Sequence, residues 1–266
     1  MIPAPVRYAR ATDVDHAFEL LGETDAKLIA GGQSLIPVMK LRIARPSLVV
    51  DISKLELRGV EIHGDELHVG SLTTWDDLLR APELHRPALA AITECAHRIG
   101  DLQVRNRGTV GGSLAHADPA SDMPAVLFAL DATVQLKSPK GERAVPLVDF
   151  VLGPFTTVLD AQEIITRIVV PLPRRGSGSA YVSVEHPASG FALAGAAALS
   201  GHDGGYRVAV TGIAAQPFLL ADDDPALEQI EVFGDRFAPA DYRRALAAVV
   251  ARRARELAAE RAKGDA

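Results

Sequence analysis

The sequence predicts an α+β protein in which a small α/β lobe and an antiparallel-sheet lobe precede a small C-terminal domain of three antiparallel strands and helices. Three observations indicate this arrangement. Helical and buried-strand patterns alternate first, hairpin signals mixed with short helices follow, and a tract rich in Pro, Gly and Ser at residues 171–179 precedes three more strand patterns and a long helix. The expected domains span residues 1–173, with lobes over about 1–54 and 55–173, and residues 179–266.

The first lobe is expected to contain one amphipathic helix followed by a strand, a second helix and another strand. Apolar residues recur at helical spacing over residues 12–21, where Thr12 is the expected N-cap. Short, mostly apolar stretches at residues 27–30 and 48–52 predict buried strands, and a helical stretch lies between them over residues 35–42. A strand, a crossover and a second strand are typical of a parallel pair.

The second lobe is expected to begin with a hairpin. Strand patterns at residues 59–62 and 67–70 flank a turn sequence, and Thr74 together with Asp77 predicts a capped helix that ends near Arg80. The later elements of this lobe are expected to be helices over residues 87–98 and 124–130 and strands over residues 132–137, 143–146 and 163–170.

Residues 99–122 are dense in Gly, Asn, Asp and Ser and contain only short apolar pieces. We interpret them as a long ordered loop, and long loops in compact domains are usually functional. Asp122 is the expected N-cap of the helix that follows. The C-terminal domain is expected to contain strands over residues 181–184, 191–200 and 206–213 and a long helix over residues 241–262.

Composition excludes several classes of protein. Apolar residues make up 48% and charged residues 23% of the 266 residues, so the chain can bury a sizeable core. The formal charge of −6 argues against a nucleic-acid partner, because nucleic acid is bound by basic surfaces. The longest apolar run is far shorter than the ~20 residues of a membrane-spanning helix, and the start lacks a signal-peptide pattern. We therefore expect a cytoplasmic protein without a membrane span.

Cys95 is the only cysteine in the sequence. A single cysteine excludes an internal disulfide, and it excludes an iron–sulfur cluster or zinc site built from several cysteines of this chain. Cys95 lies on the apolar side of its predicted helix and is best explained as part of the core. His63 and His68 flank the first hairpin, but two ligands without a third do not predict a metal site, so no metal ligands are expected.

Two pairs of adjacent glycines, Gly31-Gly32 and Gly111-Gly112, are the main candidates for a binding site. Adjacent glycines permit positive φ and remove Cβ atoms that would block a ligand, and their N–H groups can form a concave anion site. Two such sites around one pyrophosphate would bind it without Lys or Arg. A single pair is more simply a tight turn, and the chain contains neither G-x-G-x-x-G nor a P-loop sequence.

Two longer stretches enclose these glycines. The first is Ala30-Gly31-Gly32-Gln33-Ser34-Leu35, continued by Lys40-Leu41-Arg42 and Asp51-Ile52; the second is residues 99–113, continued by His116-Ala117-Asp118-Pro119 and Asp122. They are similar to the two flavin loops of the FAD-binding (medium) subunits of molybdenum hydroxylases, in particular the carbon monoxide dehydrogenase type. The FAD domain of xanthine dehydrogenase is a more distant likeness. The resemblance covers residues 3–213 and 242–253.

This resemblance implies that FAD is the cofactor, that no side chain is catalytic, and that the partners are an iron–sulfur small subunit and a molybdenum-cofactor large subunit. Asp122 would bind an FAD hydroxyl, Ile99 would lie against the cofactor, and Phe191 would lie near the isoalloxazine ring. Gln33 stands where relatives often have His, and an amide cannot tether flavin, so non-covalent FAD is expected. The implied FAD contacts are Leu28, Ile29, Ala30, Gly31, Gly32, Gln33, Ser34, Leu35, Ile99, Thr109, Val110, Gly111, Gly112, Ser113, Asp122 and Phe191.

Simpler explanations exist for Asp122 and Phe191, and for His116, which could also contact the flavin. Asp122 can be only a helix cap, Phe191 can be only core because it begins an apolar strand, and His116 can bond to local backbone. The sequence also departs from the family in two places. The connection over residues 220–235 is shorter than the usual one in the family, which is expected to contain an additional helix. Residues 185–187 (Glu-His-Pro) stand where relatives often carry basic residues.

The resulting hypothesis is an FAD-binding electron-transfer subunit of a multi-subunit molybdenum hydroxylase, which passes electrons from iron–sulfur clusters to an external acceptor. One alternative is a stand-alone flavin-dependent oxidase or dehydrogenase on the same fold. The other is a non-enzymatic module that has lost the cofactor. Co-purifying iron and molybdenum would distinguish the hypothesis from the first alternative, and a failure to bind FAD would indicate the second.

Overall fold

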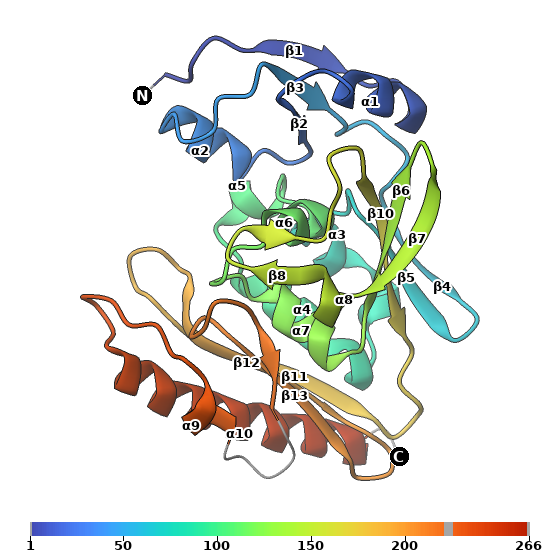
Figure 1. Cartoon of the computed structure of the whole chain (residues 1–266). Coiled ribbons are helices and arrows are strands. Elements are labelled where there is room, and N and C mark those ends of the chain that lie inside the picture. Colours follow the sequence, from blue (N-terminus) through green and yellow to red (C-terminus); the bar gives the residue numbers. More distant parts are fainter. Residues whose placement is uncertain (1, 221–225, 265–266) are drawn as a thin grey trace.

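The computed structural model describes residues 2–220 and 226–264 (Figure 1). Its N-terminal lobe is a three-stranded parallel sheet with the order β1 (Arg7–Arg10), β3 (Leu48–Asp51) and β2 (Ala26–Ile29). Helix α1 (Val14–Leu21) connects β1 to β2, and helix α2 (Leu35–Lys40) connects β2 to β3. The predicted parallel strand pair with a helical crossover is confirmed.

One strand and one helix cap of this lobe differ from the prediction. Strand β1 is largely exposed and carries no apolar pattern, yet each of its residues pairs with β3. The N-cap of α1 is Asp13 rather than Thr12, because the Asp13 carboxylate accepts a 2.8 Å hydrogen bond from the His16 N–H. A carboxylate at this position also interacts favourably with the positive end of the helix dipole.

The second lobe is built on a five-stranded antiparallel sheet in which two hairpins flank a central strand. Its apolar face is buried against the helices of the lobe. In spatial order the strands are β4 (Val60–His63), β5 (Glu66–Gly70), β10 (Ile164–Pro171), β6 (Thr133–Ser138) and β7 (Gly141–Pro146).

Several short helices and a small hairpin accompany this sheet. The first helix begins after Thr74 as predicted, because the Thr74 hydroxyl and its partner Asp77 form a complete capping box. The helix predicted over residues 87–98 is divided into a 3₁₀ turn and an α-helix that begins at Ala90. The elements are α3 (Trp75–Arg80), the 3₁₀ turns η1 (Pro82–Leu84) and η2 (Pro87–Leu89), α4 (Ala90–Arg98), α7 (Met123–Ala129), α8 (Leu147–Phe150), β8 (Val151–Gly153) and β9 (Thr156–Thr157).

Residues 99–122 are not a continuous loop, so that prediction is wrong. They contain α5 (Leu102–Arg105) and α6 (Val110–His116). Asp101 caps α5 by accepting the Val104 N–H at 2.8 Å, and Thr109 caps α6 by accepting the Gly112 N–H at 3.1 Å. Helices this short show little apolar periodicity, and glycines lower the helical propensity of α6, so neither helix has a clear sequence signal.

The C-terminal part is a four-stranded antiparallel sheet covered on one face by a long helix (Figure 1). Its elements are β11 (Gly178–Glu185), β12 (Ala192–Ser200), β13 (Tyr206–Thr211), the short added strand β14 (Phe218–Leu219) and α10 (Ala240–Gly264). Buried alanines on both surfaces, including Ala196 in β12 and Ala254 in α10, allow the helix to lie close to the sheet.

The opposite face of this sheet packs on the second lobe. Tyr181, Ala197 and Ala209 point to that side and belong to the same buried cluster as α4 and α7. The expected domain boundary at residues 171–179 covers the end of β10, the connection and the start of β11, and the division into domains stays a prediction. Because Tyr181, Ala197 and Ala209 belong to the same buried cluster as α4 and α7, the parts on the two sides of this boundary share a core.

Part of the connection over residues 220–235 lies outside the described residues, namely 221–225. The described remainder contains the short helix α9 (Ala226–Gln229). Within the ranges that the structure describes, no helix has both the length and the apolar character needed to cross a membrane.

Candidate functional site

The two glycine-containing sequences meet in space. Residues 30–34 connect β2 to α2, and residues 109–113 form the start of α6. A Cβ atom on Gly31 would lie 1.9 Å from the carbonyl oxygen of Arg107, far inside van der Waals contact. A Cβ atom on Gly112 would lie 3.9 Å from the Cβ of Ala30. The absence of a side chain at position 31 therefore lets the two sequences pack directly on each other, as a shared binding site requires.

The first glycine sequence presents a row of unused backbone donors. Among the described residues, no hydrogen bond is donated by the backbone N–H groups of residues 31–35. Gly32 has a φ of 75°, and the Ser34 side chain makes no capping hydrogen bond to α2. Successive N–H groups around a glycine of positive φ form a concave site for an anion, and the start of a helix adds to its attraction. This sequence fits a phosphate or diphosphate group.

Apolar residues within and beside this sequence pack around the loop. Leu28 and Ala30 pack against the core of the N-terminal lobe. Ile29 and Ile36 lie around Gly32, since a Cβ there would come within 3.2 Å and 2.8 Å of their Cδ1 atoms. Leu35 begins α2. The Gln33 side chain is exposed and reaches only the carbonyl of Gly31, so the amide is accessible to a ligand.

The second glycine sequence differs from the prediction. Positive φ, expected for both pairs, is absent at Gly31, Gly111 and Gly112 in the described chain. The N–H groups of Val110 and Gly111 donate to the carbonyls of Thr73 and Ser71 at 3.0 and 2.9 Å, and that of Gly112 donates to its helix cap. Gly111 is buried, but Gly112 is exposed beside Ala30. This sequence therefore offers close approach at Gly112 rather than a second row of free N–H groups.

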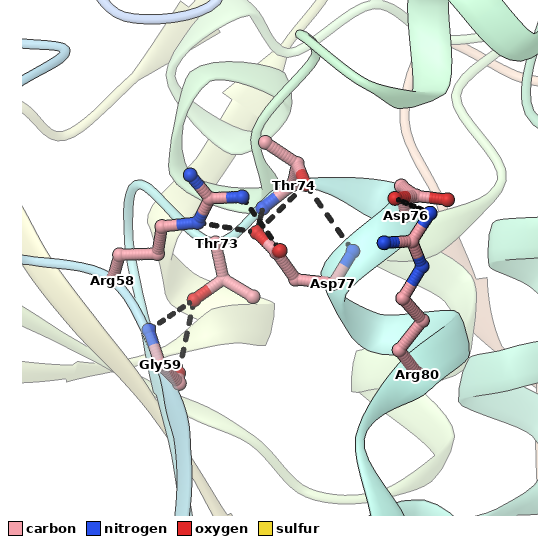
Figure 2. A network of polar contacts seen from close by, with 7 residues as sticks. All are labelled: Arg58, Gly59, Thr73, Thr74, Asp76, Asp77 and Arg80. Carbon is pink, nitrogen blue, oxygen red and sulfur yellow. Dashed lines mark hydrogen bonds and ion pairs between the residues drawn. The ribbon is translucent and has the colours of Figure 1, made fainter.

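A network of polar contacts holds residues 73–74 in place (Figure 2). These residues lie beside the second glycine sequence, where Thr74 forms a β-bridge with Thr109. Arg58 donates to both carboxylate oxygens of Asp77 at 2.6 Å, and Asp77 accepts the Thr74 N–H at 2.8 Å. The Thr73 hydroxyl accepts the Gly59 N–H at 3.0 Å and donates to the Gly59 carbonyl at 2.9 Å. Because the Thr73 carbonyl receives the Val110 N–H, this network fixes the start of α6.

Asp122 stands at the N-cap position of α7, as expected, but the explanation that it is only a helix cap is wrong. Its side chain makes no capping hydrogen bond to α7. Its carboxylate instead accepts a hydrogen bond from the hydroxyl of Tyr181, and only 7% of the residue is exposed. Burial raises the pKa of the Asp122 carboxyl to about 6, although the Tyr181 hydrogen bond favours the charged form. Its neighbour Ser121 contacts Ser113 of the second glycine sequence, with 3.0 Å between the hydroxyl oxygens.

Two apolar candidates have different surroundings. Ile99 directly follows α4 as its C-cap and is partly buried against the core of the second lobe. Phe191 is 50% exposed and precedes β12, so the explanation that it is only core is wrong. In Figure 1 the β11–β12 connection that carries Phe191 projects from the sheet on the left of the view, below α5. The roles of both residues against FAD stay predictions.

The remaining candidates from the sequence have structural explanations. The rings of His63 and His68 lie 4.7 Å apart, but each is bonded to a glutamate, and no metal-binding group is found in the described residues. Cys95 is fully buried, and burial raises the pKa of its thiol well above the usual value. The His116 ring packs 5.1 Å from that of Phe155.

Sequence reasoning missed three contributors to this site. Tyr181 reaches Asp122 from the C-terminal sheet, Arg107 contacts Gly31 through its carbonyl, and Ser121 contacts Ser113. The only sequence signal for Tyr181 is a hydroxyl-bearing side chain inside a buried strand, because such groups usually find a partner. The partner itself has no signal, since it lies far away in the sequence.

The fold and this site are those of a protein whose α/β lobe presents free backbone N–H groups, suited to a phosphate or diphosphate, beside an antiparallel-sheet lobe. Over residues 4–173 the sequence matches the family described as the FAD-binding domain in molybdopterin dehydrogenase. The medium chain of carbon monoxide dehydrogenase from Hydrogenophaga pseudoflava is 36% identical, over 96% of this chain and 97% of that relative. The glyceraldehyde dehydrogenase medium chain from Sulfolobus acidocaldarius is 41% identical, over 74% of this chain and 70% of the relative.

Solved structures agree with these relatives. A chain of carbon monoxide dehydrogenase from Hydrogenophaga pseudoflava superposes with a TM-score of 0.92 at 35% identity, covering 98% of this chain and 99% of that one. A chain of quinoline 2-oxidoreductase from Pseudomonas putida 86 gives 0.88 at 28% identity, covering 98% and 99%. The chain belongs to the family of FAD-binding domains of molybdopterin dehydrogenases. Its cofactor is FAD, and it is an oxidoreductase flavoprotein.

Proposed function

We propose that this chain is the FAD-carrying electron-transfer subunit of a multi-subunit molybdenum hydroxylase, with an iron–sulfur small subunit and a molybdenum-cofactor large subunit as partners. The observation that carries the proposal is the row of unused N–H groups at residues 31–35 beside the exposed Gly112. Backbone N–H groups bind a diphosphate without a basic side chain. The site therefore has the donors that FAD needs.

The partners follow from what the chain lacks and from the kind of relatives it has. Cys95 is the only cysteine, so this chain cannot hold a cysteine-ligated cluster, and the clusters belong to another chain. Relatives named as medium chains or medium subunits support an assembly with further chains. We propose that the complex lies in the cytoplasm.

The chain's own residues bind and orient the cofactor. FAD, when bound, supplies the redox chemistry, and the protein supplies binding and electrostatics. Gln33 can donate through its amide but cannot form a covalent link, so we propose that FAD is held non-covalently. We propose as cofactor contacts the residues Leu28, Ile29, Ala30, Gly31, Gly32, Gln33, Ser34, Leu35, Ile99, Thr109, Val110, Gly111, Gly112, Ser113, Asp122 and Phe191.

Native purification tests this function. The full-length chain, expressed together with its neighbouring genes, should elute with two further chains, and the pool should contain flavin, iron and molybdenum. Acid precipitation should release FAD into the supernatant, as expected for a non-covalent cofactor. A yellow protein that elutes alone and oxidises a substrate would contradict the assembly. A colourless protein that binds no added FAD would contradict the proposal altogether.

Replacing Phe191 by alanine tests the proposed place of the isoalloxazine ring. Because Phe191 is half exposed, its removal should cost little stability and leave FAD retention within about twofold. The visible absorption maximum or the midpoint potential of the bound flavin should shift. Phe233→Ala, which removes another half-exposed ring from a different connection, is the control. Identical flavin spectra and potentials in both variants would place the ring elsewhere.

A further inference from the structure

The segment over residues 119–122, which links α6 to α7, is held from two sides. On one side, Ser121 contacts Ser113 in the second glycine sequence at 3.0 Å. On the other side, the Thr211 hydroxyl at the end of β13 donates to the Ser121 carbonyl at 2.8 Å, and the Gly212 N–H donates to the Pro119 carbonyl at 3.3 Å. The C-terminal sheet therefore contacts backbone immediately beside the proposed flavin site.

Tyr181 forms the side-chain link between this sheet and the segment. It lies within β11, it is 2% exposed, and its hydroxyl donates to Oδ1 of Asp122. The neighbouring strand β12 makes room for this hydroxyl with a glycine. A Cβ atom on Gly195 would lie 2.3 Å from the Tyr181 hydroxyl oxygen. The hydrogen bond from Tyr181 to Asp122 therefore depends on the hydroxyl carried by β11 and on the absence of a side chain at Gly195 in β12.

The second oxygen of the Asp122 carboxylate is free for another partner. Tyr181 bonds to Oδ1, and no side chain or backbone group in the described residues donates to Oδ2. Oδ2 is not one of the fully buried side-chain atoms that lack a hydrogen-bond partner, so part of its surface is accessible to a ligand. A largely buried carboxylate is costly unless its oxygens are hydrogen-bonded, which favours a ligand hydroxyl at Oδ2.

A cleft of about 680 Å³ lies between α4 and β11. Tyr181 lines it together with Gly100 and Arg98, and Gly100 directly follows Ile99, a proposed cofactor contact. Tyr181 therefore connects Asp122, which does not itself line the cleft, to a space with room for part of an extended dinucleotide.

We propose that Tyr181 is a positioning residue of the flavin site, which orients the Asp122 carboxylate so that Oδ2 accepts a sugar or ribityl hydroxyl of FAD. This inference rests on the proposed function. It makes the C-terminal sheet part of FAD binding, although Tyr181 lies beyond the matched family region at residues 4–173. Gly195 is then required indirectly, because it admits the tyrosine hydroxyl.

Replacing Tyr181 by phenylalanine tests the proposal, because this change removes the hydroxyl and keeps the ring. The full-length apo-protein is titrated with FAD, with quenching of flavin fluorescence as the readout. FAD should bind about tenfold more weakly, the effect of losing one hydrogen bond to a charged group, and the visible circular dichroism of bound flavin should change. Tyr206→Phe, on a half-exposed tyrosine of β13, should behave as wild type.

A double-mutant cycle shows whether Tyr181 acts through Asp122. In an Asp122→Asn background, Tyr181→Phe should weaken FAD binding by less than about twofold, because the residue it positions is already changed. Multiplying effects, or wild-type binding and dichroism in the single Tyr181→Phe variant, would overturn the inference. Wild-type protein that binds no FAD would instead contradict the proposed function.

If Tyr181→Phe does not fold, as judged by far-ultraviolet circular dichroism, Gly195→Ala provides the second variant. It displaces the hydroxyl and keeps the whole tyrosine. The same weakening of FAD binding is then expected, and unchanged FAD affinity in a folded Gly195→Ala protein would overturn the inference.

Discussion

Replacing Gly31 by alanine is expected to abolish FAD retention during gel filtration of the full-length chain. The added Cβ would lie 1.9 Å from the carbonyl oxygen of Arg107 and 2.6 Å from its carbonyl carbon. Backbone atoms cannot rotate away as a side chain can, so the two glycine sequences must separate. Separating the sequences moves N–H donors away from the diphosphate, and the loss of two hydrogen bonds to a charged group should lower the FAD affinity of the apo-protein by at least about a hundredfold.

Gly153→Ala is the matched control for this prediction. Gly153 ends β8, and a Cβ atom there would meet no atom within 4 Å. Its FAD affinity should equal that of the wild type. Far-ultraviolet circular dichroism of Gly31→Ala should remain close to that of the wild type, which shows that the loss is local. Wild-type affinity in Gly31→Ala would mean that FAD does not bind where the two sequences meet.

Replacing Gly112 by aspartate is expected to weaken FAD binding by more than about a hundredfold. Gly112 is exposed beside Ala30, so the new carboxylate would face the proposed diphosphate at residues 31–35. Two like charges about 4 Å apart near a protein surface repel by about 4 kcal/mol, which exceeds the roughly 1.4 kcal/mol of a tenfold change. Titration of the apo-protein with FAD at low salt measures this effect.

Gly112→Asn separates charge from shape. A Cβ atom at position 112 would lie 2.8 Å from the Thr109 hydroxyl oxygen that caps α6. Asparagine and aspartate both add this Cβ, so asparagine carries the same steric cost without the charge. Aspartate should therefore bind FAD far more weakly than asparagine, and the difference should shrink at high salt because ions screen exposed charges. Equal affinities in the two variants would rule out an anionic group beside Gly112.

The predicted fold was correct where a pattern is local and long enough to repeat. The parallel pair of β2 and β3, the hairpin of β4 and β5, and the long helix α10 all have such patterns. The errors concern short or exposed elements. Strand β1 forms only because β3 is beside it, and α5 and α6 depend on their caps and tertiary packing rather than on an apolar face.

The site was predictable in its location but not in its detailed chemistry. Both glycine pairs were recognisable, and the structure brings them together. The expectation that both turn with positive φ was wrong, because Gly111 and Gly112 belong to α6. Asp122 looked like a helix cap because it precedes α7, yet its partner is Tyr181, far along the chain.

The sequence by itself determined which chemical groups the protein has: paired glycines, small hydroxyl residues near them, and a single cysteine that cannot hold a cluster. Tertiary structure alone decided which of these groups are available. The N–H groups of Val110 and Gly111 are used by Thr73 and Ser71, whereas those of residues 31–35 remain free within the described chain. The physical reason is that a donor is free, or a glycine necessary, only with respect to the atoms packed against it, and those atoms come from distant parts of the chain.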